Sequence, residues 1–243
     1  MAIKQILFNT DMVRAILDGR KTCTRRVVKP QLEECPHCKY VHNEYIYDKL
    51  AKNVYCARCG CPLEPERRSP YQPGDILYVR ETWQYLYELD GNEQVIEDTG
   101  KYYYAATDTI PFDTYVDENG VKHDHAPWRP SIHMPKEAAR IWLKVTDVKV
   151  ERLQEITEAQ TEEEGFLFTP PCLHRTGENY CDIDGPCESK IKYCDMSAGE
   201  LFGKVLWDST IKKSDIDIYG WDANPYVFVI EFVKIDKPEE MEK

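Results

Sequence analysis

Two pairs of closely spaced cysteines constrain the fold of this chain more than any other feature of its sequence. Cys35 and Cys38 form the first pair, Cys56 and Cys59 form the second, and 17 residues separate the pairs. Each pair presents two thiolates from one turn, and four thiolates at this spacing are typical of a tetrahedral zinc site. We therefore expect a structural zinc ion that folds its own segment of chain.

The segment around these cysteines reads as an insertion. Residues 31–68 open with CPHC, close with CARCGCP and lead into a charged, proline-bearing stretch. Gly60 suits a zinc knuckle, in which the backbone bends tightly towards sulfur. Cys61 offers a third thiol for the second pair, and we choose Cys59 as the ligand because of its spacing.

A second group of four cysteines lies in the Gly- and Asp-rich segment 171–195. Its members are Cys172, Cys181, Cys187 and Cys194. They can close another zinc site, with an iron–sulfur cluster as the alternative. In either case protein thiolates fill every coordination position and leave none for a catalytic water. We therefore interpret both cysteine groups as structural.

The balance of charge and the cellular compartment limit the functions to consider. The chain has a formal net charge of −12, which argues against a broad surface that tracks phosphates and leaves room only for a local basic site. The N-terminal stretch lacks the apolar core of a signal peptide, and no apolar run is long enough to span a membrane. We expect a cytoplasmic protein whose ten cysteines are reduced and bind metal rather than form disulfides.

The run GRKTCTRR at 19–26 gathers four cations in an otherwise acidic chain. Asn9 or Thr10 can cap a helix whose apolar residues recur at helical spacing, and Gly19 is a natural end for that helix. The run therefore begins where a helix ends. We expect its Thr and Arg side chains to lie in an exposed turn that leads into an extended stretch.

The remaining pattern indicates several strands and few helices. Strands are expected at 3–8, 76–82, 101–107, 141–150 and 226–235. Capping boxes at Thr157 and Ser197 predict two helices, the first ending near Gly165. This content favours an α+β fold built on a small closed or half-closed β-barrel.

Gly19, Lys21 and Arg26 fit the G-x-K-x-x-x-x-R signature of ASCH domains, which are small β-barrels of the PUA-like superfamily. A strand–helix unit before the signature, the strand GDILYV and a helix ending in Glu164 and Gly165 extend this resemblance. Stretches such as GDILYVRETW also resemble uncharacterised phage and prophage proteins. The resemblance implies a PUA-like barrel formed by residues 1–30 and 69–243, with 31–68 and 171–195 as zinc-binding insertions.

Within the ASCH group, the small bacterial N4-acetylcytidine amidohydrolases are similar around the same turn. They share a Lys-x-x-Thr pair and a distant Glu, which correspond here to Lys21, Thr24 and Glu164, with Glu162 and Glu163 beside the last. The resemblance implies that Lys21 activates the Thr24 hydroxyl as a nucleophile. Glu164 would then protonate the leaving N4 nitrogen.

Other members of the superfamily bind RNA or modified bases without cleaving them, so three hypotheses follow. The first is recognition of a nucleobase, nucleoside or RNA element in a basic cleft at residues 19–26. The second is hydrolysis of an N4-acetylcytidine-like substrate, and the third is a non-catalytic phage protein-interaction module. Side chains suited to contact an RNA, nucleoside or nucleotide by charge or stacking are Arg25, Arg26, Arg80 and Trp83.

Overall fold

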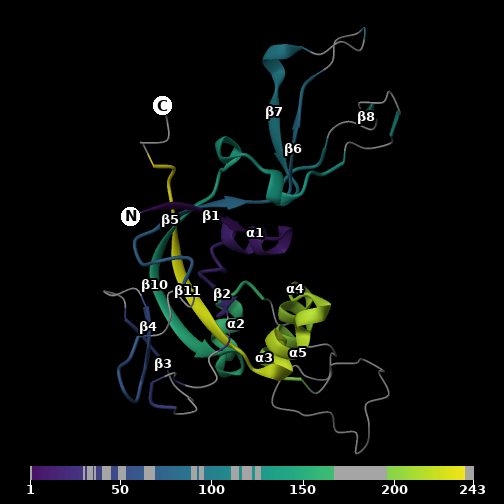
Figure 1. The fold of residues 1–243 in the computed structure, drawn as a ribbon. Coiled ribbons are helices and arrows are strands. Elements are labelled where there is room, and N and C mark those ends of the chain that lie inside the picture. Colours follow the sequence, from purple (N-terminus) through teal and green to yellow (C-terminus); the bar gives the residue numbers. More distant parts are fainter. Residues whose placement is uncertain are drawn as a thin grey trace, which may run out of the picture. The chain divides into compact units, whose positions relative to one another are not determined.

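The computed structural model of the chain has an α+β fold with a five-stranded sheet (Figure 1). It describes residues 2–29, 31, 35, 37–39, 45–48, 53–62, 69–88, 92, 96–110, 115–116, 122–123, 127–166 and 196–238. The second cysteine group, in 171–195, lies outside these residues.

The strands carry mostly β-branched and aromatic residues, as in the β11 sequence YVFVIEFVKI. In chain order they are β1 (Ile3–Leu7), β2 (Cys23–Val27), β3 (Tyr45–Asp48), β4 (Asn53–Cys56), β5 (Ile76–Arg80), β6 (Trp83–Leu86), β7 (Lys101–Tyr104), β8 (Tyr115–Val116), β9 (Lys122–His123), β10 (Trp142–Arg152) and β11 (Tyr226–Ile235). The large sheet has the order β1-β5-β10-β11-β2, in which the two longest strands are neighbours (Figure 1).

The helices are short. They are α1 (Thr10–Leu17), α2 (Glu158–Glu163), α3 (Ala198–Leu201), the π-helix η7 (Phe202–Trp207), α4 (Asp208–Thr210) and α5 (Ile216–Tyr219). Single 3₁₀ turns are η2 (Glu97–Thr99), η3 (Ser131–His133), η4 (Lys136–Ala138), η5 (Leu153–Glu155), η8 (Lys213–Asp215) and η9 (Trp221–Ala223). Of the helices in the described ranges, none has the length and apolarity to cross a membrane.

The chain divides into two compact units, and their boundaries fall within β10 and β11. Unit 1 comprises Met1–Gly19, Pro73–Thr146 and Phe232–Lys243. In this unit β1 runs parallel to β5, which pairs antiparallel with β10, and β6 pairs with β7. One cluster of the buried core of unit 1 contains Ile76, Trp83, Met134, Ala138, Ala139 and Trp142.

Unit 2 comprises Arg20–Gln72 and Asp147–Glu231. Its strands β2 and β11 pair antiparallel, and β3 pairs with β4. Helices α3 to α5 lie close together in this unit (Figure 1). One cluster of its buried core contains Cys23, Leu153, Ile156, Phe202, Trp207, Trp221, Val227 and Val229.

The local signals for helix starts are confirmed. The Asn9 side chain accepts a hydrogen bond from the Met12 amide at 2.9 Å, and α1 begins at Thr10. Thr157 and Ser197 both form complete capping boxes. The predicted strands are present too, although those at 76–82 and 101–107 end earlier, as β5 and β7. These elements were predicted because caps and alternation are signals within a few residues of the element itself.

The prediction of an exposed turn at 19–26 is wrong. Residues from Cys23 onwards form β2, and Lys21, Thr24 and Arg25 are at most 3% exposed. Pairing with β11 satisfies the backbone of this segment, and carboxylates from distant parts of the sequence face its cations. The pairings of the described strands leave β1 and β2 as sheet edges, so the sheet is open there. The predicted domain boundaries stay predictions.

Candidate functional site

The four cysteines of the two close pairs converge on one point. Their sulfur atoms all lie within 4.8 Å of one another. The Cys35 and Cys59 sulfurs are 3.5 Å apart, and the Cys38 and Cys56 sulfurs are 3.8 Å apart. Four sulfurs about 2.3 Å from a tetrahedral zinc are about 3.8 Å from one another. The four thiols therefore fit a zinc ion, and they form a site that can hold a metal.

The two cysteine turns have the same backbone geometry. The amide of Lys39 donates to the carbonyl of Cys35, and the amide of Gly60 donates to the carbonyl of Cys56, each at 2.9 Å. Both donors have positive φ, 55° at Lys39 and 68° at Gly60. The Cys59 amide also donates to the Cys56 sulfur at 3.3 Å, an interaction that stabilises a thiolate. This repeated turn has the tight backbone bend that the spacing predicts for a metal-binding knuckle.

The third thiol of CARCGC is not part of the four-sulfur group. The Cys61 carbonyl accepts a hydrogen bond from the Cys56 amide at 3.0 Å, which closes the second turn. The Cys61 sulfur lies 4.0 Å from the Cys59 carbonyl oxygen. Because four thiolates already complete a tetrahedron, a metal here has no open position and its role is structural.

A second group of side chains forms a buried charged cluster, which we define as Lys21, Arg25, Glu151 and Glu164. The Lys21 ammonium donates to a carboxylate oxygen and to the backbone carbonyl of Glu164, each at 2.7 Å. Arg25 Nη1 donates to the other carboxylate oxygen at 3.2 Å. The side chains of Lys21, Arg25 and Glu164 are only 0%, 1% and 3% exposed, so solvent screens these ion pairs little.

Helix α2 and the start of β2 bring the cluster together. Glu164 is the C-cap of α2, and Gly165 follows it with a φ of 82°, a value that favours glycine. The Thr22 amide donates to the Glu163 carbonyl at 2.8 Å, and Arg20 donates to the Gly165 carbonyl at 3.4 Å. These bonds fasten the end of α2 to the chain that carries Lys21.

Strand geometry separates the two halves of the predicted catalytic group. Successive side chains of a strand point to opposite faces, and Arg25 shares a face with Cys23, whose sulfur lies 3.9 Å from Nη1. Thr24 and Arg26 therefore point the other way. Within the described ranges, the Thr24 hydroxyl makes no hydrogen bond to Lys21 or Glu164. The structure brings Lys21, Arg25 and Glu164 together, and it leaves Thr24 apart.

Arg25 is incompletely satisfied. Its Nη2 lies 3.6 Å from a carboxylate oxygen of Glu151, which is 24% exposed. Its Nε and Nη2 are buried and have no hydrogen-bond partner among the residues that the structure describes. Such orphaned donors are rare in folded proteins and are often a sign of a missing ligand or water. Glu151 was missed in the sequence, where its charge at the end of a strand is the only signal.

Cys23 lies beside this cluster as a structural residue. Burial, followed by the nearby Glu164 carboxylate, raises the pKa of the Cys23 thiol to about 12. A thiol with such a pKa stays protonated near neutral pH and is a poor nucleophile.

The other three residues predicted to contact a ligand lie in different surroundings. Arg26 is half-buried in β2. Arg80 and Trp83 belong to unit 1, where Arg80 donates to the Gln5 side chain at 2.6 Å and to the Ile132 carbonyl. Trp83 is 5% exposed and lies under the Arg129 guanidinium at 5.4 Å, so its ring is not an open stacking platform. Trp83 Nε1 is buried without a hydrogen-bond partner in the described part of the chain.

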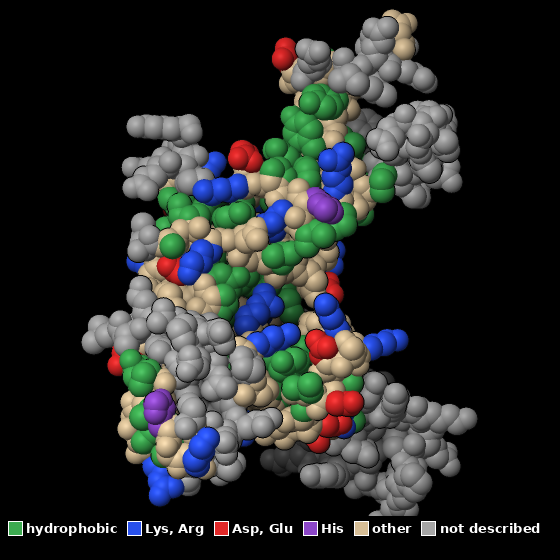
Figure 2. Space-filling model, in the orientation of Figure 1, with side chains coloured by type: hydrophobic (Ala, Val, Ile, Leu, Met, Phe, Trp, Pro, Cys, Tyr) green, Lys and Arg blue, Asp and Glu red, His purple; other side chains and the backbone are tan. Residues whose placement is uncertain are grey.

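On the face shown in Figure 2, lysine and arginine side chains are interspersed with acidic and hydrophobic ones. Searches of protein-family models, of curated proteins and of solved structures find no match to this chain.

Proposed function

We propose that this chain is an ASCH-type, PUA-like protein that recognises a nucleobase or nucleoside, free or within an RNA element, through the charged cluster of unit 2. The observation that carries the proposal is the unsatisfied Nε and Nη2 of Arg25. A guanidinium offers these two N–H groups side by side and in one plane, which suits a planar partner with two adjacent acceptors.

The charges of the cluster favour a neutral ligand. Two cations face two carboxylates, and the formal charges of Lys21, Arg25, Glu151 and Glu164 cancel. A phosphate would add unbalanced negative charge beside buried carboxylates, which is costly. A nucleobase brings hydrogen-bonding groups without net charge.

The order of donors and acceptors favours one class of base edge. The Glu151 carboxylate accepts, and the neighbouring Nη2 and Nε of Arg25 donate. The complementary edge carries one donor followed by two acceptors, as in the N4 amino group, N3 and O2 of cytosine. Proteins read unstacked bases on such Watson–Crick edges. Because Arg25 is 1% exposed, binding includes an opening step that uncovers this edge.

The amidohydrolase hypothesis is the second candidate, and one observation favours it. The contact between Lys21 and Glu164, which the resemblance implies, is present at 2.7 Å. Two features oppose it. Thr24 lies on the other face of β2, and the Lys21 amine donates to the carboxylate and to the backbone carbonyl of Glu164. Lys21 would have to lose a proton before it accepts one from Thr24.

A nucleoside panel tests the proposal. We expect calorimetry to detect binding of cytidine and N4-acetylcytidine more strongly than of uridine, adenosine or guanosine. Arg25→Lys keeps the charge but removes the paired donors, and it should weaken binding at least about tenfold. Arg152→Lys is the matched control, because Arg152 donates to the Asn224 carbonyl and stacks on Tyr226 in the same unit. Absence of nucleoside binding at millimolar concentrations would refute the proposal.

The same samples test the second candidate. Chromatography of N4-acetylcytidine incubated with the protein should show no cytidine or acetate if the cluster only binds. Turnover that Thr24→Val abolishes, with binding unchanged, would replace recognition by hydrolysis as the function.

A further inference from the structure

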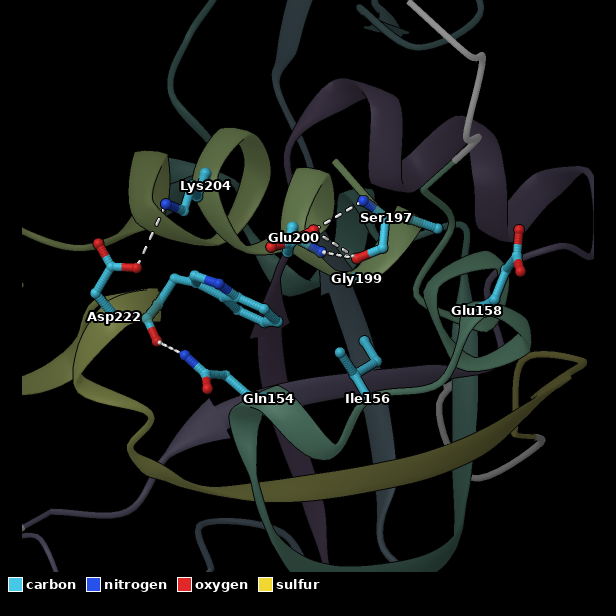
Figure 3. A pocket seen from close by; sticks show the side chains of 10 residues that line it. Gln154, Ile156, Glu158, Ser197, Gly199, Glu200, Lys204 and Asp222 are labelled. Atoms are coloured by element: carbon cyan, nitrogen blue, oxygen red, sulfur yellow. Dashed lines mark hydrogen bonds and ion pairs between the residues drawn. The ribbon is translucent and has the colours of Figure 1, made fainter. Parts of the chain in front are cut away.

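We propose that a pocket in unit 2, separate from the charged cluster, binds an alkylguanidinium or alkylammonium group. The pocket has a volume of about 440 Å³, within the range of small-ligand sites. Its walls come from η5, the first turns of α2 and α3, the π-helix η7 and the turn η9 (Figure 3). The residues that line it are Gln154, Ile156, Glu158, Ser197, Ala198, Gly199, Glu200, Lys204, Trp221 and Asp222.

The part of the pocket wall formed by Trp221 is fixed before any ligand arrives. The backbone carbonyl of Trp221 accepts from the Gln154 side chain at 2.8 Å, and its amide donates to Asp208 at 2.7 Å. Gly203 lies so close to the indole that a Cβ there would be 2.0 Å from Cδ2 of Trp221. A site whose walls are locked in this way loses little conformational entropy on binding.

The charge of the pocket selects a cation. Glu158, Glu200 and Asp222 oppose a single cation, Lys204, so the formal charge of the lining is −2. The Lys204 ammonium lies 3.5 Å from Asp222, whose side chain is 83% exposed. In Figure 3 Glu158 and Asp222 stand at opposite ends of the pocket, with Glu200 between them. Three carboxylates are thus spread along the pocket, and they disfavour an anion.

The position of Glu200 is also fixed. One of its carboxylate oxygens accepts from the Ser197 amide at 2.9 Å and pairs with the Ser197 hydroxyl at 3.0 Å (Figure 3). Glu200 is therefore held at the wall by the capping box of α3, where a ligand finds it already oriented.

The uncharged part of the lining suits the carbon chain of such a cation. Ile156 and Trp221, which are 8% and 6% exposed, form a small apolar part of the wall next to the carboxylates. An alkyl stem gains by contact with apolar side chains of this kind. Lys204 lies in a π-helix, a rare conformation that is frequent at functional sites. Ligands with both features, a cationic head and an alkyl stem, are an arginine or lysine side chain and a free alkylamine.

The test uses the full chain and defined probes. Nα-acetyl-arginine amide and Nα-acetyl-lysine amide represent the side chains of a peptide, spermidine represents a free amine, and Nα-acetyl-citrulline amide is the neutral analogue of the arginine probe. We expect the cationic probes to shift the amide NMR signals of Gly199 and Trp221, and the citrulline probe to have little effect. The shifts should shrink with added salt.

Substitutions that lower or raise the negative charge of the pocket distinguish ligand binding there from a general structural effect. Glu158→Gln and Asp222→Asn should each weaken binding about two- to fivefold, while Lys204→Gln should strengthen it by a similar factor. Glu162→Gln and Asp217→Asn remove the same charges from exposed positions that do not line the pocket, and they should leave affinity unchanged. Equal responses to arginine and citrulline probes, or weaker binding by Lys204→Gln, would overturn the proposal.

Discussion

At the scale of single residues, the contact between Lys21 and Glu164 was predictable but its environment was not. The two residues are 143 positions apart, and only the resemblance to a known family linked them. Cations in a sequence normally indicate exposure, because charged side chains are rarely fully buried. Here a partner from α2 permits burial, and no local pattern around residues 19–26 reveals that partner. The ion pair of Arg25 with Glu151 was missed for the same reason.

Removing the carboxylate of Glu164 should strongly destabilise the fold. Glu164→Gln leaves two buried cations without their shared anion, and we expect the free energy of unfolding to fall by about 3–5 kcal/mol. The control is Glu231→Gln, which breaks an ion pair with Lys149 at 2.6 Å whose partners are 48% and 40% exposed. That change should cost at most about 1 kcal/mol. Urea denaturation measures both, and similar losses would show that the cluster contributes no more than a surface pair.

The thiol of Cys23 should make stability depend on alkaline pH. Its pKa is raised to about 12 in the fold from the usual value of 9.0, mainly by burial. The folded state therefore keeps a proton that the unfolded state loses, so this stabilisation is fully present below pH 9.0 and disappears as pH rises towards 12. Cys23→Ala should lose stability less steeply than the parent protein over this range, as measured by thermal unfolding. Equal slopes would contradict the assignment.

At the scale of elements, the convergence of the four knuckle cysteines was predictable because its signal is local. The spacing of two cysteine pairs specifies two turns, and the structure repeats one turn geometry at both. Local signals also located the starts of α1, α2 and α3. The π-helix η7 was not predicted; its Gly203 packs closely against Trp221, a tertiary contact that no local pattern reveals. Likewise β2 reads as a charged turn until its pairing with β11 is known.

Metal should be required for the knuckle and not for the rest of the chain. We expect at least one zinc per chain, retained by Cys61→Ala and lost by Cys59→Ala, because only the second substitution removes a sulfur of the four-thiol group. Chelation should increase hydrogen exchange in β4 and leave β11 protected, since metal binding supplies the folding energy of such a segment. Elemental analysis and exchange mass spectrometry provide the readouts. Metal retained by Cys59→Ala and lost by Cys61→Ala would reverse the ligand assignment.

At the scale of the whole molecule, the α+β class and the strands β1, β5, β7, β10 and β11 followed from the hydrophobic pattern, whereas the other six described strands and the strand order did not. The parallel pairing of β1 with β5 joins segments separated by the knuckle, and nothing in the alternation of either strand specifies it. The pattern also could not distinguish an open sheet from a barrel, because both have the same alternation along each strand. Closure depends on which edges meet, and that is a property of the folded chain.

The net charge of the molecule predicts how the affinity for a ligand depends on salt concentration. A protein that follows a nucleic-acid backbone releases counterions, and the logarithm of its affinity falls with the logarithm of salt concentration by about 0.7 for each phosphate contacted on a single strand. With a net charge of −12 and a charged cluster that is formally neutral, this chain should contact few phosphates. We expect cytidine and a short cytidine-containing RNA to bind with similar affinity and with a slope no steeper than about −1. Calorimetry at salt concentrations from about 50 mM to about 500 mM measures this slope. A slope of several units, with much tighter binding of the RNA, would move recognition from the base to the backbone and away from Arg25.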